Sequence, residues 1–264
     1  MRIPTESQGE GCDLERRIVF GGIDCHNVSL RFGRKAEPAL LGVTFKIKWG
    51  EFVVIAGASG SGKSTLMKAL LRLHDPQTGS ILIDGVDIRQ VAPPELRRSI
   101  GYAPQYPKMM YGTIAQNMRL YEPSATMAEL EDACRELGIL EMVQGLPEGF
   151  DTRFGDQTVN RLPPGFLNCF SVAAALLRRP AILLLDEAHD GLDGEMEAKL
   201  LACIARLRGK TTIVMSTHRP SHMRMADRIL LLDQGRIVEN APPAEAMERV
   251  QAHLFGADAA GQRK

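Results

Sequence analysis

The sequence predicts an α/β fold built on a buried, mainly parallel sheet. Three short apolar runs, 52–57, 181–187 and 211–218, resemble buried strands, and each one ends in glycine or polar residues. Continuous apolar runs of this length are typical of strands that are covered on both faces. A helical run follows the first of them directly, at 64–74, which is the strand–helix order of an α/β unit.

Residues 23–47 predict a second, different sheet. The runs IDCHNVSLRF and VTFKIKW alternate apolar and polar residues, a pattern typical of antiparallel strands with one buried face. Residues 1–22 are polar and Gly-rich, so we expect them to form a linker or an arm. The sequence therefore places an antiparallel β lobe ahead of the parallel core.

Composition limits the possible functions of the chain. Its 264 residues are 44% apolar and have a formal net charge of zero, which suits one domain or one domain with a lobe. Binding to nucleic acid requires clustered Lys and Arg, and only isolated basic pairs occur. No apolar run approaches the roughly 18 residues of a membrane span, and residues 1–17 do not resemble a signal peptide. The five cysteines lack metal-ligand spacing, so we expect reduced thiols.

The segment GASGSGKST, 57–65, fits the pattern G-x-x-x-x-G-K-S/T between a predicted strand and a predicted helix. Its glycines allow backbone N–H groups to turn toward a phosphate, and the helix N-terminus adds a favourable dipole. Lys63 would then reach the β- and γ-phosphates and Ser64 would hold Mg²⁺. A plain Gly/Ser turn is the alternative, and the flanking strand and helix argue against it.

Two other predicted strands also end in residues suited to catalysis. In AILLLDEAHDGLD, Asp186 would bind Mg²⁺ through water, and Glu187 would act as the general base toward an attacking water. In TTIVMSTHRP, His218 lies at the strand tip, the edge where ligands gather in open α/β sheets. The alternatives are a solvated acidic turn and an ordinary histidine. His189 is expected to be a loop residue beside the acidic pair.

From about residue 23 to 245 the order of these motifs resembles the nucleotide-binding domain of an ABC transporter. The fold implied is a RecA-like P-loop core with an antiparallel β lobe and an inserted α-helical lobe at about 106–178, followed by a C-terminal helix and tail at 246–264. The resemblance implies that Gln105 contacts Mg²⁺ or the attacking water. It also identifies residues expected to contact the nucleotide: Phe32, which would stack on adenine, and Gly57, Ser59, Gly60, Ser61, Gly62, Lys63, Ser64, Thr65, Gln105, Gly165 and Asp186.

The segment LPPGF, 162–166, occupies the place of the family's signature motif LSGGQ. Pro163 stands where the family has a serine hydroxyl, Pro164 replaces a glycine N–H, and Phe166 replaces the glutamine. Only Gly165 remains as a plausible donor. Prolines are tolerated in the first turn of a helix, so we expect the helix that follows, at 166–177, to be intact while the capping chemistry is lost.

The resemblance implies an ATPase that uses Mg²⁺, with Lys63, Gln105, Glu187 and His218 in catalytic roles. Segments 111–120 and 146–156 are similar to the exporter branch. We therefore expect a transmembrane exporter domain and a second nucleotide-binding domain as partners, no nucleic acid, and a location on the cytoplasmic face of the membrane. Because the signature motif is degenerate, we expect an asymmetric heterodimer. An ATP-binding regulatory or structural module with little hydrolysis is the alternative.

Overall fold

The computed structural model describes residues 18–33, 37–155, 162–163 and 165–255. An antiparallel sheet comes first, with the strand order β2-β1-β4-β5. Its strands are β1 (Ile23–Arg31), β2 (Pro38–Ile47), β4 (Thr78–Ile83) and β5 (Val86–Asp87). The prediction of antiparallel strands in 23–47 is therefore confirmed, and β4 and β5 extend the same sheet.

A second sheet forms the centre of the molecule, in the order β12-β11-β3-β10-β9-β6. Neighbouring strands from β11 to β6 are parallel, and β12 pairs antiparallel to β11. The strands are β3 (Phe52–Ala56), β6 (Ile100–Ala103), β9 (Ile182–Asp186), β10 (Thr212–Ser216), β11 (Arg228–Asp233) and β12 (Arg236–Ala241). The three predicted buried strands are β3, β9 and β10, and they are adjacent, so their carboxyl ends meet at one edge of the sheet.

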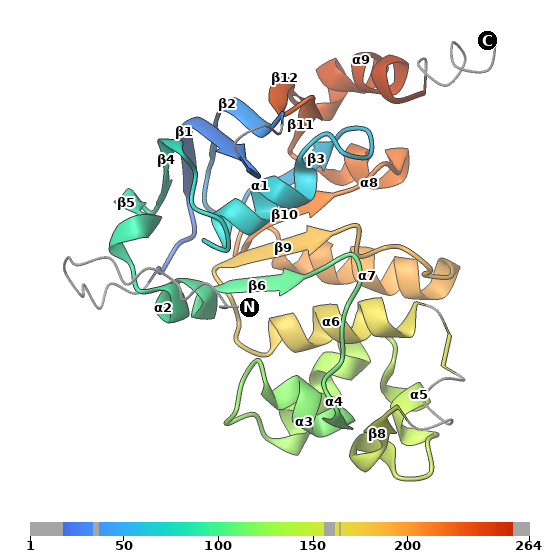
Figure 1. Ribbon diagram of the computed structural model, residues 1–264. Coiled ribbons are helices and arrows are strands. Elements are labelled where there is room, and N and C mark those ends of the chain that lie inside the picture. The colour runs from blue at the N-terminus through green and yellow to red at the C-terminus, as the bar shows by residue number, and fades with distance from the viewer. Residues whose placement is uncertain (1–17, 34–36, 156–161, 164, 256–264) are drawn as a thin grey trace.

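Helices cover the central sheet and extend to one side of it (Figure 1). The segment between β6 and β9 carries α3, α4, α5 and α6 together with a small hairpin of β7 and β8, and lies below the sheet in this view. The helices are α1 (Lys63–Leu70), α2 (Pro93–Arg98), α3 (Ile114–Arg119), α4 (Met127–Glu136), α5 (Leu140–Gln144), α6 (Phe166–Leu176), α7 (Gly194–Leu207), α8 (Pro220–Met225) and α9 (Pro243–Phe255). The hairpin strands are β7 (Gly112–Thr113) and β8 (Arg153–Phe154), and the 3₁₀ turns are η1 (Ile88–Gln90) and η2 (Gly149–Asp151).

The alternation of side chains along β3 divides the core between the two faces of the central sheet. Val53 and Ile55 pack with α1 and the antiparallel sheet, whereas Phe52 and Val54 pack with the helical side of the molecule. Successive strand side chains point to opposite faces, so a strand that is apolar at every position is buried on both faces. This burial holds the carboxyl ends of β3, β9 and β10 in fixed positions.

Helix α6 begins at Phe166, with Gly165 at its N-cap. Pro163 therefore precedes the helix, in agreement with the predicted helix at 166–177, and Pro164 is outside the described residues. The Phe166 N–H donates to the Pro163 carbonyl at 3.0 Å and forms a tight turn, whereas the Cys169 N–H makes the first helical bond to the Gly165 carbonyl at 3.1 Å. Within the described residues, no helix is long and apolar enough to cross a membrane.

Candidate nucleotide-binding and catalytic site

The Gly-rich loop joins the end of β3 to the start of α1, as the sequence predicts. Gly57, Gly60 and Gly62 have φ angles of 153°, 80° and 112°, a range that favours glycine. A Cβ atom on Gly57 would lie 2.3 Å from the Leu232 carbonyl oxygen. This loop therefore requires glycine for close approach as well as for its backbone angles.

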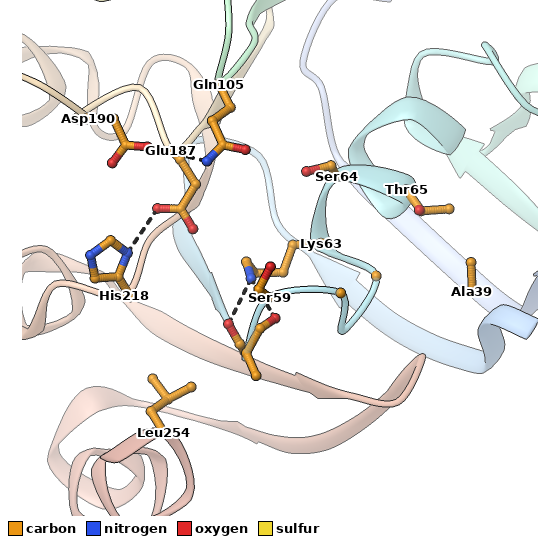
Figure 2. A pocket seen from close by; sticks show the side chains of 14 residues that line it. Ala39, Ser59, Lys63, Ser64, Thr65, Gln105, Glu187, Asp190, His218 and Leu254 are labelled. Atoms are coloured by element: carbon orange, nitrogen blue, oxygen red, sulfur yellow. Dashed lines mark hydrogen bonds and ion pairs between the residues drawn. The ribbon is translucent and has the colours of Figure 1, made fainter. Parts of the chain in front are cut away.

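A pocket of about 510 Å³ opens over this loop (Figure 2). Residues of the loop and of α1 form one side, and residues from five other segments complete it. The lining residues are Gly57, Ala58, Ser59, Gly60, Gly62, Lys63, Ser64 and Thr65, together with Ala39, Gln105, Glu187, Asp190, His218 and Leu254. Residues far apart in the sequence thus share one cavity.

The Lys63 side chain lies folded against the loop itself. Its Nζ atom donates to the carbonyl oxygens of Gly57 at 2.7 Å and Ala58 at 3.0 Å. Burial lowers the pKa of Lys63, while the nearby carboxylates of Glu187 and Asp186 oppose that shift. The structure therefore holds an ammonium group inside the pocket, and these weak carbonyl partners would be readily exchanged for an anion.

The turn after β9 directs two carboxylates toward this edge of the sheet. Glu187 has a positive φ of 49°, which is rare for a residue with a long side chain. Ser216, at the end of β10, stabilises the turn: its Oγ accepts from the Glu187 N–H at 2.9 Å and donates to Asp186 Oδ1 at 2.7 Å. Backbone strain of this kind is typical of functional sites.

Glu187 faces the pocket beside His218. The Glu187 residue is 8% exposed, and its Oε2 atom lies 3.2 Å from His218 Nδ1. Burial raises the pKa of Glu187, and the charges of His218 and Lys63 oppose the rise. A buried carboxylate with a raised pKa is suited to accept a proton near neutral pH.

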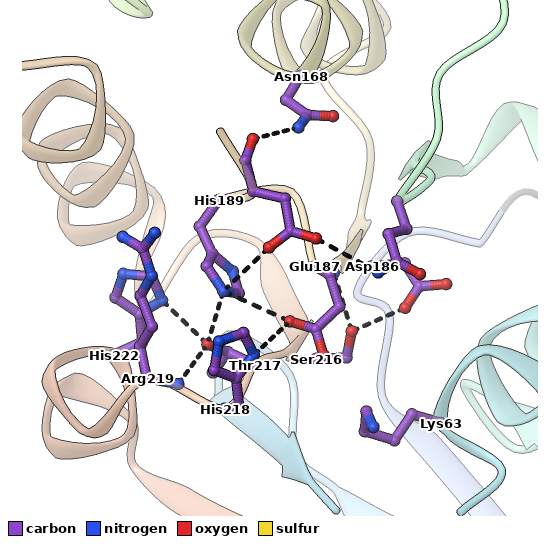
Figure 3. A network of polar contacts seen from close by, with 12 residues as sticks. Lys63, Asn168, Asp186, Glu187, His189, Ser216, Thr217, His218, Arg219 and His222 are labelled. Carbon is purple, nitrogen blue, oxygen red and sulfur yellow. Dashed lines mark hydrogen bonds and ion pairs between the residues drawn. The ribbon is translucent and has the colours of Figure 1, made fainter. Parts of the chain in front are cut away.

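Behind Glu187 is a cluster of polar side chains that was not predicted as a unit (Figure 3). His189 is fully buried, and its Nε2 lies 3.4 Å from both Glu187 Oε2 and Thr217 Oγ1. Thr217 also contacts His222 Nδ1 at 3.2 Å, and His222 Nε2 lies 2.7 Å from Glu197 Oε1. Sequence reasoning treated His189 as a loop residue and His222 as structural or solvated, since nothing in their local patterns indicates that they meet.

Gln105 extends into the pocket from the segment after β6. Its Nε2 donates to Asp190 Oδ2 at 3.3 Å, and the Asp190 carbonyl accepts a 2.6 Å hydrogen bond from Asn168 on α6. Helix α6 is thereby linked to the pocket, because Asn168 fixes the loop that carries Asp190. The contact joins segments 22 residues apart, so no local sequence pattern indicates a role for Asn168.

Four predicted nucleotide contacts lie outside the pocket lining, namely Phe32, Ser61, Gly165 and Asp186. Phe32 is 48% exposed and packs edge to face on His74, with 4.9 Å between ring centroids. Ser61 and Asp186 are buried behind the pocket wall. Gly165 is buried against the loop 191–192, where an added Cβ would lie 2.7 Å from the Gly191 carbonyl oxygen.

Comparison with known proteins identifies the family. The sequence model of the family described as ABC transporter matches residues 40–190, more than half of the chain. The chain belongs to the ABC transporter family. Within this family it represents the ATP-binding domain of exporter-type transporters, a class of domain that binds ATP, generally with Mg²⁺, and hydrolyses it.

Relatives of this ABC domain carry transporter names. The uncharacterized ABC transporter ATP-binding protein YfiB of Bacillus subtilis is 38% identical over 96% of the chain and 44% of its own length. An ATP-dependent lipid A-core flippase of Cupriavidus pinatubonensis is 37% identical over 92% of the chain and 41% of its own length. The chain therefore spans less than half the length of these relatives.

A solved structure also resembles the ABC domain. It is the structure of a bacterial Atm1-family ABC exporter with ATP bound, and it superposes with a TM-score of 0.85 at 31% identity. The match covers 96% of the chain and 46% of the exporter chain. The predicted fold class, a P-loop α/β core with an antiparallel β lobe and an inserted helical lobe, is confirmed by this agreement and by the two sheets.

Proposed function

We propose that this ABC domain hydrolyses ATP to drive an exporter-type transporter, within an asymmetric pair of nucleotide-binding domains. The observation that carries the proposal is that Lys63, Glu187 and His218 line the same pocket although they come from three separate segments. A cation for phosphate, a buried carboxylate base and an imidazole are the groups that phosphoryl transfer to water requires. An ATP-binding module with little hydrolysis would not need Glu187 in this position.

The residues present fit ATP with Mg²⁺. Among the described residues, the buried Ser61 hydroxyl has no hydrogen-bond partner and Lys63 Nζ donates to two backbone carbonyls, so the loop offers donors for a phosphate. We assign Ser64, Gln105 and Asp186 as the groups that would hold Mg²⁺, Asp186 through water because it lies behind the pocket wall. Bound Mg²⁺ would neutralise charge on the phosphates.

In the proposed reaction, Glu187 accepts a proton from the water that attacks the γ-phosphate. Its raised pKa suits this role, since a general base works best when its pKa lies near the working pH. His218 holds the Glu187 carboxylate in place and, with Lys63, stabilises the charge that develops on the phosphate. We further propose that Phe32 stacks on the adenine ring, which its exposed face permits.

The signature segment supports asymmetry. Gly165 lies outside the pocket of its own chain, in agreement with a role toward the nucleotide of a partner domain. Pro163 lacks both an N–H and a hydroxyl, so the donors of this segment are reduced. Each lost hydrogen bond to a charged group costs roughly 1.5–3 kcal/mol, so two losses correspond to about 10²–10⁴-fold slower turnover at the partner's site.

An exposed apolar segment supports a transmembrane partner. Tyr106, Met110 and Tyr111 are 76%, 63% and 85% exposed and lie in the segment 106–111, which follows Gln105. Several exposed apolar groups within one short segment are typical of an interaction surface. We propose that the membrane domain of the exporter docks here, on the cytoplasmic face of the membrane. Movement of the nucleotide-binding domain as it closes around ATP would then be transmitted through Gln105 to the membrane domain.

The test is a mixing experiment with purified domains. ATP turnover by this chain should rise when it is mixed with an exporter nucleotide-binding domain that carries LSGGQ and a Glu→Gln change at its own catalytic glutamate. That mutation silences the partner's own site, so any gain arises at the pocket of this chain. No gain with several such partners, under conditions in which ATP binding to this chain is measured, would rule out the asymmetric pair.

A further inference from the structure

Three potential metal ligands converge where the cluster behind Glu187 meets the pocket. Glu187 Oε2, His189 Nε2 and His218 Nδ1 all lie within 4.8 Å of one another (Figure 3). Glu187 and His189 lie in the turn that follows β9, and His218 follows the end of β10. Both strands are buried at every position, so the points from which these segments start are fixed.

The spacing agrees with tetrahedral coordination. Bonds of about 2.0–2.1 Å from Zn²⁺ to nitrogen and oxygen place two ligands of a tetrahedron roughly 3.3–3.4 Å apart. Glu187 Oε2 lies 3.4 Å from His189 Nε2 and 3.2 Å from His218 Nδ1. Two of the three distances between ligand atoms therefore already agree with a tetrahedron. The third joins His189 Nε2 and His218 Nδ1, and rotation of the His218 side chain, which is 59% exposed, would adjust it.

His189 provides a second, independent observation. Its side chain is fully buried, and Nε2 is the ring atom that lies against Glu187 Oε2 and Thr217 Oγ1. Both of these contacts are 3.4 Å long, which is longer than the usual 2.9–3.0 Å of an N–H···O bond. Buried polar groups are normally paired, and an exception requires an explanation.

We propose that Glu187, His189 and His218 form a transition-metal site that binds Zn²⁺ and holds the pocket in an inactive state. Two imidazoles and one carboxylate are a zinc ligand set, whereas Mg²⁺ prefers oxygen ligands. Asp190 Oδ1, 3.8 Å from His189 Nε2, or a water would complete the tetrahedron. Inhibition would follow because the ion occupies the carboxylate and the imidazole that hydrolysis uses. Only this inhibitory part rests on the proposed function.

The metal site is tested by spectroscopy on the full chain, without nucleotide. We would titrate chelator-treated protein with Co²⁺ in the presence of excess Mg²⁺ and record the visible d–d bands, which are intense for tetrahedral and weak for octahedral Co²⁺. We expect tetrahedral bands that saturate at about one ion per chain and disappear on addition of Zn²⁺. Octahedral bands only, or a thiolate charge-transfer band that assigns the ion to a cysteine, would overturn the site.

Variants locate the ion. His189→Asn and His218→Asn should each lose the tetrahedral bands, whereas His26→Asn should keep them. His26 is a matched control because its exposed imidazole also lies against a carboxylate, 3.0 Å from Asp24. Circular dichroism would show that each variant is folded. Bands that persist in folded His189→Asn protein, or that vanish in His26→Asn, would contradict the assignment.

Turnover measurements test the inhibitory part separately. In the mixture with the partner domain and MgATP, Zn²⁺ should abolish ATP hydrolysis, and the concentration for half inhibition should rise at least about tenfold when this chain carries His189→Asn. Saturating Co²⁺ binding without any Zn²⁺ inhibition would overturn this part. A mixture that lacks turnover even without Zn²⁺ would count against the proposed function, and the spectroscopic result would be unaffected.

Discussion

The Nδ1 atom of His218 lies 3.2 Å from Oε2 of Glu187, although 31 positions separate the two residues in the sequence. This contact exists because β9 and β10 are neighbours in the parallel sheet and end at the same edge. Each strand carries its polar residue just beyond its last apolar position. The folded core thus sets the distance between the base and the imidazole, and that distance links the fold to the proposed chemistry.

Replacing the base tests the chemistry directly. Glu187→Gln keeps the size of the side chain but removes its ability to accept a proton, so in the mixture with the partner domain we expect ATP turnover to fall about 10²–10⁴-fold while ATP binding is retained. Measurement of phosphate release and of nucleotide affinity on the same samples would check both expectations. The matched control is Glu195→Gln, an exposed glutamate of α7, which should behave as the native chain. Unchanged turnover in Glu187→Gln would exclude a general-base role.

Removing the imidazole should alter the pH dependence of turnover. Burial raises the pKa of Glu187, and the nearby His218 lowers it. In His218→Ala this opposing influence is absent, so the pKa of Glu187 should rise further. Because only the ionised carboxylate accepts a proton, the acid limb of the kcat/KM profile should move to higher pH. His26→Ala, at an exposed histidine of β1 outside the pocket lining, serves as the control, and an acid limb that stays in place or moves to lower pH would refute this coupling.

The glycine before α6 is required for packing. A Cβ on Gly165 would lie 2.7 Å from the Gly191 carbonyl and 2.8 Å from a Leu192 methyl group. We expect Gly165→Ala to lower the free energy of unfolding by about 1–3 kcal/mol, as overpacking does elsewhere. Urea denaturation would measure the change. Gly194→Ala is the control, since its Cβ would enter open space at the start of α7. Equal stability of both variants would contradict the packing argument.

Glu197 should stabilise the chain in a pH-dependent manner. Burial opposes its ionisation, but hydrogen bonds from Arg219 and His222 outweigh burial and hold the pKa of Glu197 below its usual value. At pH values well above its usual pKa, the Glu197 carboxylate is charged in both the folded and the unfolded state, so its stabilising effect is complete near neutral pH. It disappears as pH falls through the lowered pKa.

In Glu197→Gln we therefore expect a loss of stability on the order of 2 kcal/mol at pH 7 that shrinks in acid. Denaturation midpoints for the native and variant chains at several pH values would show this convergence. A difference that is constant with pH, or that grows in acid, would contradict the assigned direction of the pKa shift.

Local patterns were sufficient to predict the main elements of the site. The Gly-rich segment, the acidic pair after β9 and the histidine after β10 each follow an apolar run, and parallel strands bring such ends to one edge. The sheets themselves were predicted for the same reason, since continuous and alternating apolar runs distinguish buried strands from half-buried ones. Periodicity and motif spacing were therefore sufficient to predict the two sheets and these three parts of the site.

The remaining features depend on tertiary contacts that no local pattern encodes. His189 reaches Glu187 because the backbone turns sharply at Glu187, with its φ of 49°, and a sequence does not report that angle. Asn168 reaches the Asp190 carbonyl across two segments.

Repair of the signature segment tests the central claim, that this chain has a complete pocket but an impaired signature. We would measure ATP turnover against protein concentration for the native chain and for Pro163→Ser combined with Pro164→Gly, with nucleotide binding recorded in parallel. We predict that the native chain alone binds ATP with little turnover. In the repaired chain, the rate of ATP turnover should be about 10²–10⁴-fold higher and should rise with protein concentration. Turnover by the native chain that rises with concentration, is lost in Glu187→Gln and is not improved by the repair would contradict this prediction.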